Sequence, residues 1–167
     1  METSVPDPAS APTGVGIVVM VAFWLAAAWM YANLIWAVPH IRRALLRVPE
    51  EHRKIPHRWL GLLGVPIISG ASAFLVGLGL PRSIHAALDA QGDAEGIDCG
   101  RWEGCILVCI VNFANMGFFM ALDQFGPAID SEPPSWAVEG GLCFYGGVVT
   151  RKFVRKISRV SQLIVAK

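Results

Sequence analysis

Two long apolar runs without any charged residue flank a strongly basic loop, and this pattern determines the solvent in which the chain can fold. Residues 15–38 and 59–80 contain no Asp, Glu, Lys or Arg. A helix needs about 20 apolar residues to cross the hydrocarbon core of a bilayer, so each run is long enough to span it. The loop between them, residues 40–58, holds six of the chain's 14 basic residues. The sequence therefore predicts an integral membrane protein.

The composition agrees with this interpretation. The chain is 54% hydrophobic, and only 16% of its residues are charged, against about 25% in typical soluble domains. Its basic residues gather in the loop at 40–58 and in the tail at 151–167, with only Arg82 and Arg101 elsewhere. Basic clusters beside apolar runs are typical of membrane topology signals, and we therefore expect no binding to nucleic acid.

The apolar pattern predicts an all-α fold of about four hydrophobic helices. Pro39 is expected to end the first helix, Pro66 to kink the second and Pro81 to end it. Three organisational units follow: an extended tail at 1–14, a transmembrane helical domain at 15–150 and a basic amphipathic tail at 151–167. The predicted apolar segments are 15–38, 59–80 and 104–122, which are long enough to span, and a shorter fourth segment that begins near residue 133.

The fourth segment creates a topology conflict. Cytoplasmic loops carry the excess of Lys and Arg, which places the basic loop inside and the acidic connection at 81–103 outside. If all four segments span, the basic tail lies outside and violates the rule. If residues 136–150 only dip into the membrane, the tail lies inside. Both arrangements remain open from the sequence.

Small residues in the second segment indicate close helix packing. Glycines at a helix surface allow a neighbouring backbone to approach, which drives helix association in membranes. The residues predicted to serve this purpose are Gly61, Gly64, Gly70 and Gly77.

A polar stripe is predicted along the third segment and continues into the fourth. At 100° per residue, Asn112 and Asp123 fall on one line with Asn115 beside it, and such a face avoids lipid. These amide and carboxylate groups either line a proton or ion path or hydrogen-bond a neighbouring helix. Glu139 is the one acidic residue within an apolar segment, so it is either a proton carrier or counter-ion, or a solvated group near the membrane edge.

Basic residues at the membrane surface are expected to contact lipid headgroups, including anionic lipid, or a partner subunit. The residues predicted for this contact are Arg42, Arg43, Arg151, Lys152, Arg155 and Lys156.

No reaction chemistry is evident in the sequence. The four cysteines form no CxxC pair, and no zinc spacing, nucleotide fingerprint or nucleophile–base arrangement occurs. His40 and His57 flank the basic loop, and a haem held by these two histidines is one interpretation, but contact with headgroups or water is favoured. We therefore expect no cofactor and no metal site.

The sequence favours an accessory or structural subunit of a larger membrane complex, acting by helix packing and by contact with lipid or partner subunits. The alternative is a small oligomeric channel or transporter with a polar path along the third and fourth helices. A lipid-modifying enzyme ranks third, and we expect the chain not to be an enzyme. Both a bacterial inner membrane and an organelle inner membrane fit.

Overall fold

Four α-helices dominate the structure, a computed structural model that describes residues 14–56, 60, 62, 66–92, 94–124 and 133–164. No strand occurs within these ranges. Side chains are described over 17–56, 60, 62, 69–92, 94–116 and 137–164. The helices are α1 (Gly14–Arg47), α2 (Pro66–Asp89), α3 (Arg101–Gln124) and α4 (Pro133–Val160), with short 3₁₀ turns η2 (Glu50–His52) and η4 (Ser161–Leu163).

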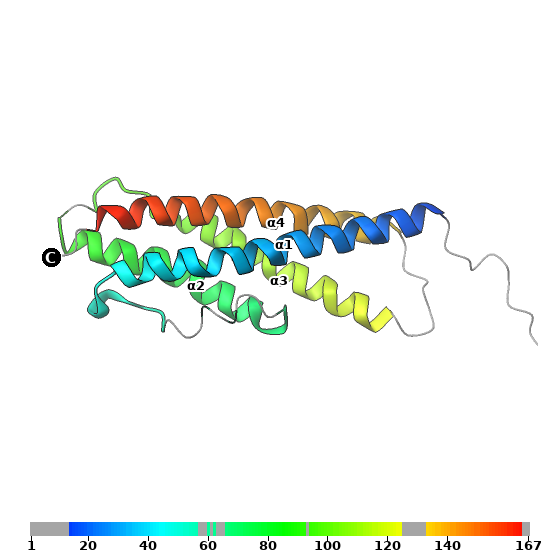
Figure 1. Ribbon diagram of the computed structural model, residues 1–167, viewed down its shortest axis with the longest axis horizontal. Helices are drawn as coiled ribbons and strands as arrows, with labels where there is room; N and C mark the ends of the chain where they lie inside the picture. The colour runs from blue at the N-terminus through cyan, green and yellow to red at the C-terminus, as the bar shows by residue number, and fades with distance from the viewer. Residues whose placement is uncertain are drawn as a thin grey trace, which may run out of the picture.

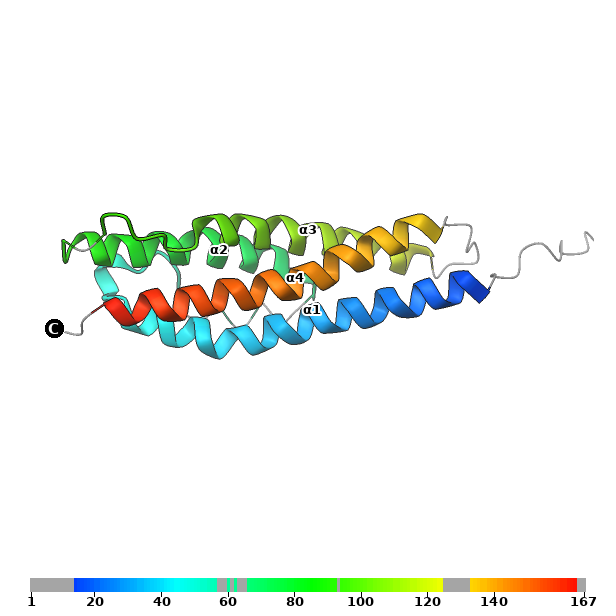
Figure 2. The same ribbon diagram turned by 90° about the horizontal axis from the view of Figure 1, so that it is seen from above.

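The helices form an elongated bundle in which three run in the same direction. In Figures 1 and 2, α1, α2 and α4 all run toward the end that carries the C-terminus, and only α3 runs back. The parallel packing of α1 on α4 is fixed at both ends. Near the start, Gly140 lies so close to Phe23 that a Cβ on the glycine would be 3.4 Å from the Phe23 Cα. Near the C-terminal ends of the two helices, Arg47 Nη1 donates to Ser161 Oγ at 3.2 Å.

The core runs along the whole bundle and is filled by aliphatic and aromatic side chains. From α1 these include Phe23, Met30 and Leu34, and from α4 Phe153 and Ile157, all almost fully buried. Gly146 allows α4 to pack closely against both α3 and α1. A Cβ on this glycine would lie 2.7 Å from the Ile110 Cγ2 of α3 and 3.0 Å from the Met30 Sδ of α1.

The closest backbone contact joins α2 to α3. A Cβ built on Gly104 would lie only 1.9 Å from the Gly77 carbonyl oxygen, so this oxygen occupies the space of a side chain. Residue 81, four positions after Gly77, is a proline inside α2 and has no N–H to bond this carbonyl. The free oxygen instead packs on the Gly104 Cα, the geometry of a weak Cα–H···O contact between helices.

The charged segments gather at one end of the bundle. The connection after α1 reaches α2 where Lys54 N donates to Ser83 Oγ at 2.9 Å. The start of α3 meets the end of α4 where Lys156 Nζ lies 2.7 Å from Glu103 Oε1. The basic loop, the acidic connection and the basic tail therefore share this end, which we call the charged end. The other half of the bundle is built from the apolar parts of the helices.

The all-helical class and four helices are confirmed, but the bounds differ from the prediction. Both expected stops are wrong, because Pro39 lies inside α1 and Pro81 inside α2. Pro66 begins α2 and does not kink it, in keeping with the preference of proline for the first helical turn. The basic tail is the continuation of α4, which runs unbroken from Pro133 to Val160.

The predicted position of the acidic connection is wrong as well. An antiparallel pair of first and second helices would place it opposite the basic loop. In the structure α2 instead runs in the same direction as α1, so both helices end at the charged end (Figure 1). Within the part of the chain that the structure describes, two helical stretches are long and apolar enough to cross a membrane, Ile17–Arg47 and Ser69–Asp89.

Candidate functional site

A basic groove between α1 and α4 is the most developed candidate site. It encloses about 570 Å³ at the charged end. Trp36 and Val154 form its apolar walls. Its polar lining comprises His40 from α1 and, from α4 and η4, Arg151, Arg155, Ser158, Arg159 and Gln162.

Arg151 is held at the inner end of the groove by two residues of α1. Its Nε donates to Asn33 Oδ1 at 2.5 Å, and its guanidinium carbon lies 4.5 Å from the centre of the Trp29 ring. Asn33 is oriented in turn by donating its Nδ2 to the Trp29 carbonyl at 2.7 Å. The close fit depends on Gly147, because a Cβ there would lie 2.4 Å from Trp29 Nε1. No hydrogen bond between described residues uses the terminal nitrogens of Arg151, which leaves them available to a ligand.

The three groove arginines have no acidic partner among the described residues. Arg151, Arg155 and Arg159 are four residues apart, so they lie on one face of α4. All three are exposed, and none takes part in the ion pairs of the described residues. Like charges at this spacing repel each other. The groove is therefore an unneutralised cationic surface.

His40 adds a ring nitrogen to the groove. Its Nδ1 lies 3.0 Å from the Trp36 carbonyl oxygen, and because a carbonyl only accepts, Nδ1 must donate this proton. The free ring nitrogen is then Nε2. The His40 and Trp36 rings lie 4.4 Å apart between centres, which holds both side chains against the wall of the groove.

Lys156 faces away from the groove and is neutralised. Its Nζ bonds Asp98 and lies 2.7 Å from Glu103 Oε1. Desolvation alone would lower the pKa of Lys156, but these two carboxylates outweigh it and the pKa is raised. The hydrogen bond from Lys156, helped by the Gly100 N–H, lowers the pKa of Asp98. Of the other predicted basic contacts, Arg42, Arg43 and Lys152 are exposed and lie outside the groove lining.

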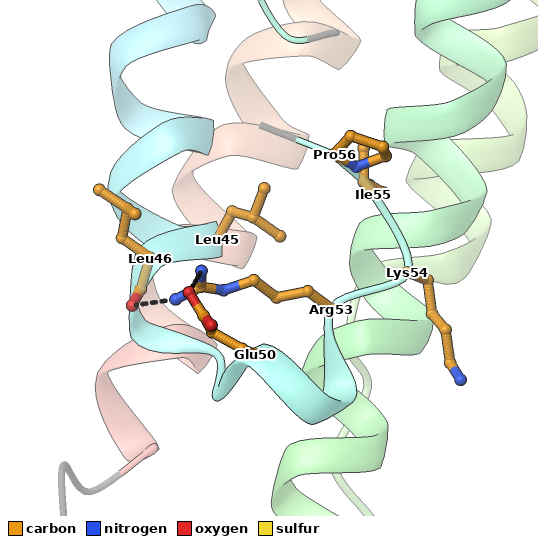
Figure 3. Close-up of a pocket in the computed structure, with 7 residues that line it drawn as sticks. All are labelled: Leu45, Leu46, Glu50, Arg53, Lys54, Ile55 and Pro56. Atoms are coloured by element: carbon orange, nitrogen blue, oxygen red, sulfur yellow. Dashed lines mark hydrogen bonds and ion pairs between the residues drawn. The ribbon is translucent and has the colours of Figure 1, made fainter. Parts of the chain in front are cut away.

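A second hollow of about 350 Å³ lies beside the end of α1 and has a structural explanation (Figure 3). Arg53 reaches across it to the last carbonyls of the helix. Its Nε donates to the Val48 carbonyl at 2.8 Å and its Nη2 to the Leu46 carbonyl at 3.3 Å, while Nη1 pairs with Glu50 at 3.1 Å. This guanidinium caps a helix C-terminus, so its donors are used within the fold.

The predicted polar stripe is divided by the fold. Asn115 is buried and accepts a hydrogen bond from the Tyr31 hydroxyl at 2.6 Å, and its Nδ2 donates to Ser69 Oγ at 3.0 Å. Asn112 is exposed and donates to the Val108 carbonyl of its own helix at 2.8 Å. Glu139 is half-buried on α4, and the Asp123 side chain lies outside the described residues.

The predicted packing glycines that are described lie within the chain's own α2–α3 contact. A Cβ on Gly77 would lie 2.6 Å from the Gly104 carbonyl, and one on Gly70 would lie 2.6 Å from Asn112 Oδ1. Gly61 and Gly64 lie outside the described residues. Gly104, Gly146 and Gly147 fit just as tightly but were not predicted, because no periodic run of small residues marks them.

Metal and redox groupings are not found among the described side chains. Within the part of the chain that the structure describes, no three His, Cys, Asp or Glu side chains gather as metal ligands. The four cysteines are free: Cys99 and Cys143 are buried, and Cys105 and Cys109 are exposed. His57, considered with His40 for a haem, lies outside the described residues.

Sequence reasoning missed the groove itself, although it selected Arg151 and Arg155. The spacing of four between the arginines is visible in the sequence, but Trp36 and His40, which line the same groove, lie more than 100 positions away from them.

Comparisons with protein-family profiles, with curated proteins and with solved structures find no match to this chain.

Proposed function

We propose that this chain is an integral membrane protein that serves as an accessory subunit of a larger membrane complex, acting by binding rather than by catalysis. The observation that carries the membrane assignment is the outer face of α1. Val18 and Leu25 are each 67% exposed and Ile35 is 58% exposed. A continuous exposed apolar stripe of this kind is a liability in water but is the normal surface of a helix in lipid.

The helix lengths support a bilayer placed around the apolar half. At 1.5 Å per residue, α1 covers about 33 Å from Gly14 to Trp36, and α3 covers about the same from Trp102 to Gln124. The part of α4 before Arg151 covers about 27 Å. These lengths suit a hydrocarbon core of about 30 Å. We infer that α1, α3 and α4 cross and that α2 enters from the charged end.

The exposed tryptophans support the position of the membrane surface. Trp36 on α1 is 42% exposed and is the last exposed large apolar side chain before Arg42. Trp102 is 72% exposed and lies between Arg101 and Glu103 at the start of α3. Tryptophan is enriched at the interface between lipid and water. The charged end then projects into the cytoplasm, matrix or stroma, and a bacterial inner membrane or an organelle inner membrane fits.

The proposed partner surface is the outer face of α3. Cys109, Phe113 and Met116 are exposed there, and Asn112 is exposed at the edge of this face, beside Gly70 of α2. An amide that faces lipid is unfavourable, whereas one that faces another helix can hydrogen-bond across the contact. The Asn112 carboxamide is therefore the feature that favours a partner helix over lipid on this face.

Extraction in mild detergent, followed by a native gel and mass spectrometry, tests the subunit assignment. The wild-type chain should migrate with other membrane subunits. Asn112→Ala should release it from them while its own fold remains intact, because the carboxamide bonds only to its own helix among the described residues and alanine adds no bulk beside Gly70 of α2. The matched control is Cys109→Leu, an apolar change on the same face, which should leave the assembly in place.

Cysteine labelling in intact membranes tests the membrane assignment separately. Cys109 is exposed on the protein, so a water-soluble maleimide should modify it if the chain folds in water. In a bilayer the same thiol faces lipid or a partner and should stay unmodified until detergent is added. A Lys152→Cys variant supplies the control at the charged end, where labelling should be rapid. Rapid labelling of both positions in intact membranes contradicts the bilayer placement.

A small oligomeric channel is the second candidate, favoured by the positions of two polar groups. Asn112 is exposed and Glu139 is half-buried, so both polar groups are accessible from outside the bundle. A polar path that used them would run between copies of the chain. This proposal predicts a homogeneous small oligomer and an ion flux in liposomes that Glu139→Gln abolishes.

A further inference from the structure

We propose that the basic groove between α1 and α4 binds the phosphate group of an anionic membrane lipid. This inference rests on the proposed membrane embedding and adds a defined ligand site to it. A lipid phosphate and free inorganic phosphate share the chemistry that the groove recognises, and the position and apolar walls of the groove favour the lipid.

The positive charge of the groove favours an anionic ligand. Arg151, Arg155 and Arg159 line one wall, and the described residues provide none of them with a carboxylate. Lys156, about 100° around the same helix from Arg155, is bound by Asp98 and Glu103. The fold thus neutralises the lysine that lies beside the acidic connection and leaves the groove arginines to an external partner. Arginine is the side chain best suited to phosphate, because its planar guanidinium donates two parallel hydrogen bonds.

The inner end of the groove is organised before a ligand arrives. Arg151 uses its Nε on Asn33 and stacks on the Trp29 ring, which fixes the guanidinium plane. Its outer nitrogens keep their donors. A phosphate that binds there need not immobilise a flexible side chain, and preorganisation of this kind strengthens binding. Ser158 and the free nitrogen of His40 add hydrogen-bonding groups along the same groove.

The position of the groove identifies the lipid as the source of the phosphate. Along α1, the exposed apolar face ends with Ile35 and Trp36, and exposed arginines follow at positions 42 and 43. Lipid phosphates lie at this transition between hydrocarbon and water. Trp36 also forms one wall of the groove, so the groove opens beside the surface along which acyl chains would lie. A site for free phosphate has no need of this apolar border.

Native mass spectrometry of the purified full chain in mild detergent measures the site. Phosphatidylglycerol is titrated against phosphatidylcholine, and each bound lipid is counted. We expect one tightly held phosphatidylglycerol. Arg155→Gln and Arg159→Gln should each weaken it at least about tenfold, which corresponds to the loss of one charge-assisted hydrogen bond. Arg155→Lys should recover part of the affinity, because it keeps the charge without the bidentate geometry.

Lys152→Gln is the matched control, since it removes one exposed charge from α4 outside the groove. It should change the affinity by no more than about twofold. An equal loss in this variant would show that the lipid responds to the overall charge and would overturn the groove assignment. Unchanged binding in the arginine variants, or displacement of the lipid by millimolar inorganic phosphate, would also overturn it.

Failure of this inference is distinguishable from failure of the proposed function. The arginine variants should still resist alkaline extraction from membranes, because the apolar faces are untouched. Loss of lipid with retained membrane insertion supports the groove. A wild-type chain that alkaline carbonate releases from membranes contradicts the embedding on which the inference rests.

Discussion

Replacing Gly104 by alanine probes the contact that holds α2 against α3. The added Cβ would lie 1.9 Å from the Gly77 carbonyl oxygen and 2.8 Å from its carbon. Non-bonded contacts of this kind need at least about 3.0 Å, so the two backbones must separate by about 1 Å. The obstacle is a backbone atom that cannot rotate aside, which places the loss near the upper end of the 1–3 kcal/mol usual for overpacking, about 3 kcal/mol.

Part of this loss is offset, because alanine favours a helix over glycine by up to about 1 kcal/mol. We expect a net destabilisation of about 2 kcal/mol. For a chain of this size that corresponds to a fall in the melting temperature of about 4–8 °C. The measurement is thermal unfolding of the purified chain in mild detergent, followed by circular dichroism or tryptophan fluorescence.

Alanine variants of two further glycines provide melting temperatures for comparison. A Cβ on Gly141 meets nothing within 4 Å, so Gly141→Ala should be neutral or stabilising through helix propensity alone. Gly77→Ala should be intermediate, because its Cβ would lie 2.6 Å from the Gly104 carbonyl and 2.8 Å from a movable methyl of Val108. A Gly104→Ala variant that melts at or above the wild-type temperature would refute the reasoning, since the close backbone contact could not then exist.

Three other substitutions have defined outcomes. Lys156→Gln should destabilise the chain by about 0.2–1 kcal/mol at neutral pH, the usual range for a surface ion pair. Because the pKa of Asp98 is lowered and the pKa of Lys156 is raised, this difference should persist between about pH 4 and pH 10 and vanish as the pH falls through the Asp98 pKa or rises through that of Lys156. Measured melting temperatures of wild type and variant that differ equally at pH 2 and pH 7 would contradict the pairing. Asn115→Leu should cost about 1 kcal/mol in the same assay, because the Tyr31 hydroxyl loses the Asn115 oxygen as its acceptor. Asn112→Ala should leave the melting temperature unchanged, because the Asn112 carboxamide bonds only its own helix among the described residues and alanine adds no bulk beside Gly70.

Sequence reasoning was reliable where the local pattern dominates. The uncharged runs predicted the start of α1 to within one residue and both ends of α3 to within three, and the proline pair at 133 and 134 marked the start of α4. Hydrophobic periodicity over many residues is a strong signal, because a helix must present one continuous face to its surroundings.

The prolines show where local reasoning failed. Pro81 was expected to end a helix, yet α2 continues past it to Asp89. The cost of proline inside a helix is an unbonded carbonyl four residues earlier. Here that carbonyl belongs to Gly77 and packs on Gly104, so a tertiary contact compensates for a local defect. A pairing between positions 77 and 104 is invisible to any rule that considers one segment at a time.

The candidate site was predictable in its charges but not in its shape. The sequence identified Arg151 and Arg155 as surface contacts, and Arg159 shares their spacing. It also treated Lys156 as equivalent to them, whereas the fold pairs that lysine with Asp98. The difference depends on which side of α4 meets the acidic connection, and that is set by the direction of α2.

The direction of α2 also removes the topology conflict in the sequence. An antiparallel α1–α2 hairpin with four spans would place the basic tail across the membrane from the basic loop. In the structure α1 and α4 run parallel, and Arg47 reaches Ser161 at 3.2 Å, so both basic segments lie at one end. The same parallel packing brings Trp36 and His40 beside the α4 arginines and thereby creates the groove. In the proposed bilayer placement, this one topological feature would satisfy the positive-inside rule and assemble the proposed lipid site at the surface where anionic headgroups lie.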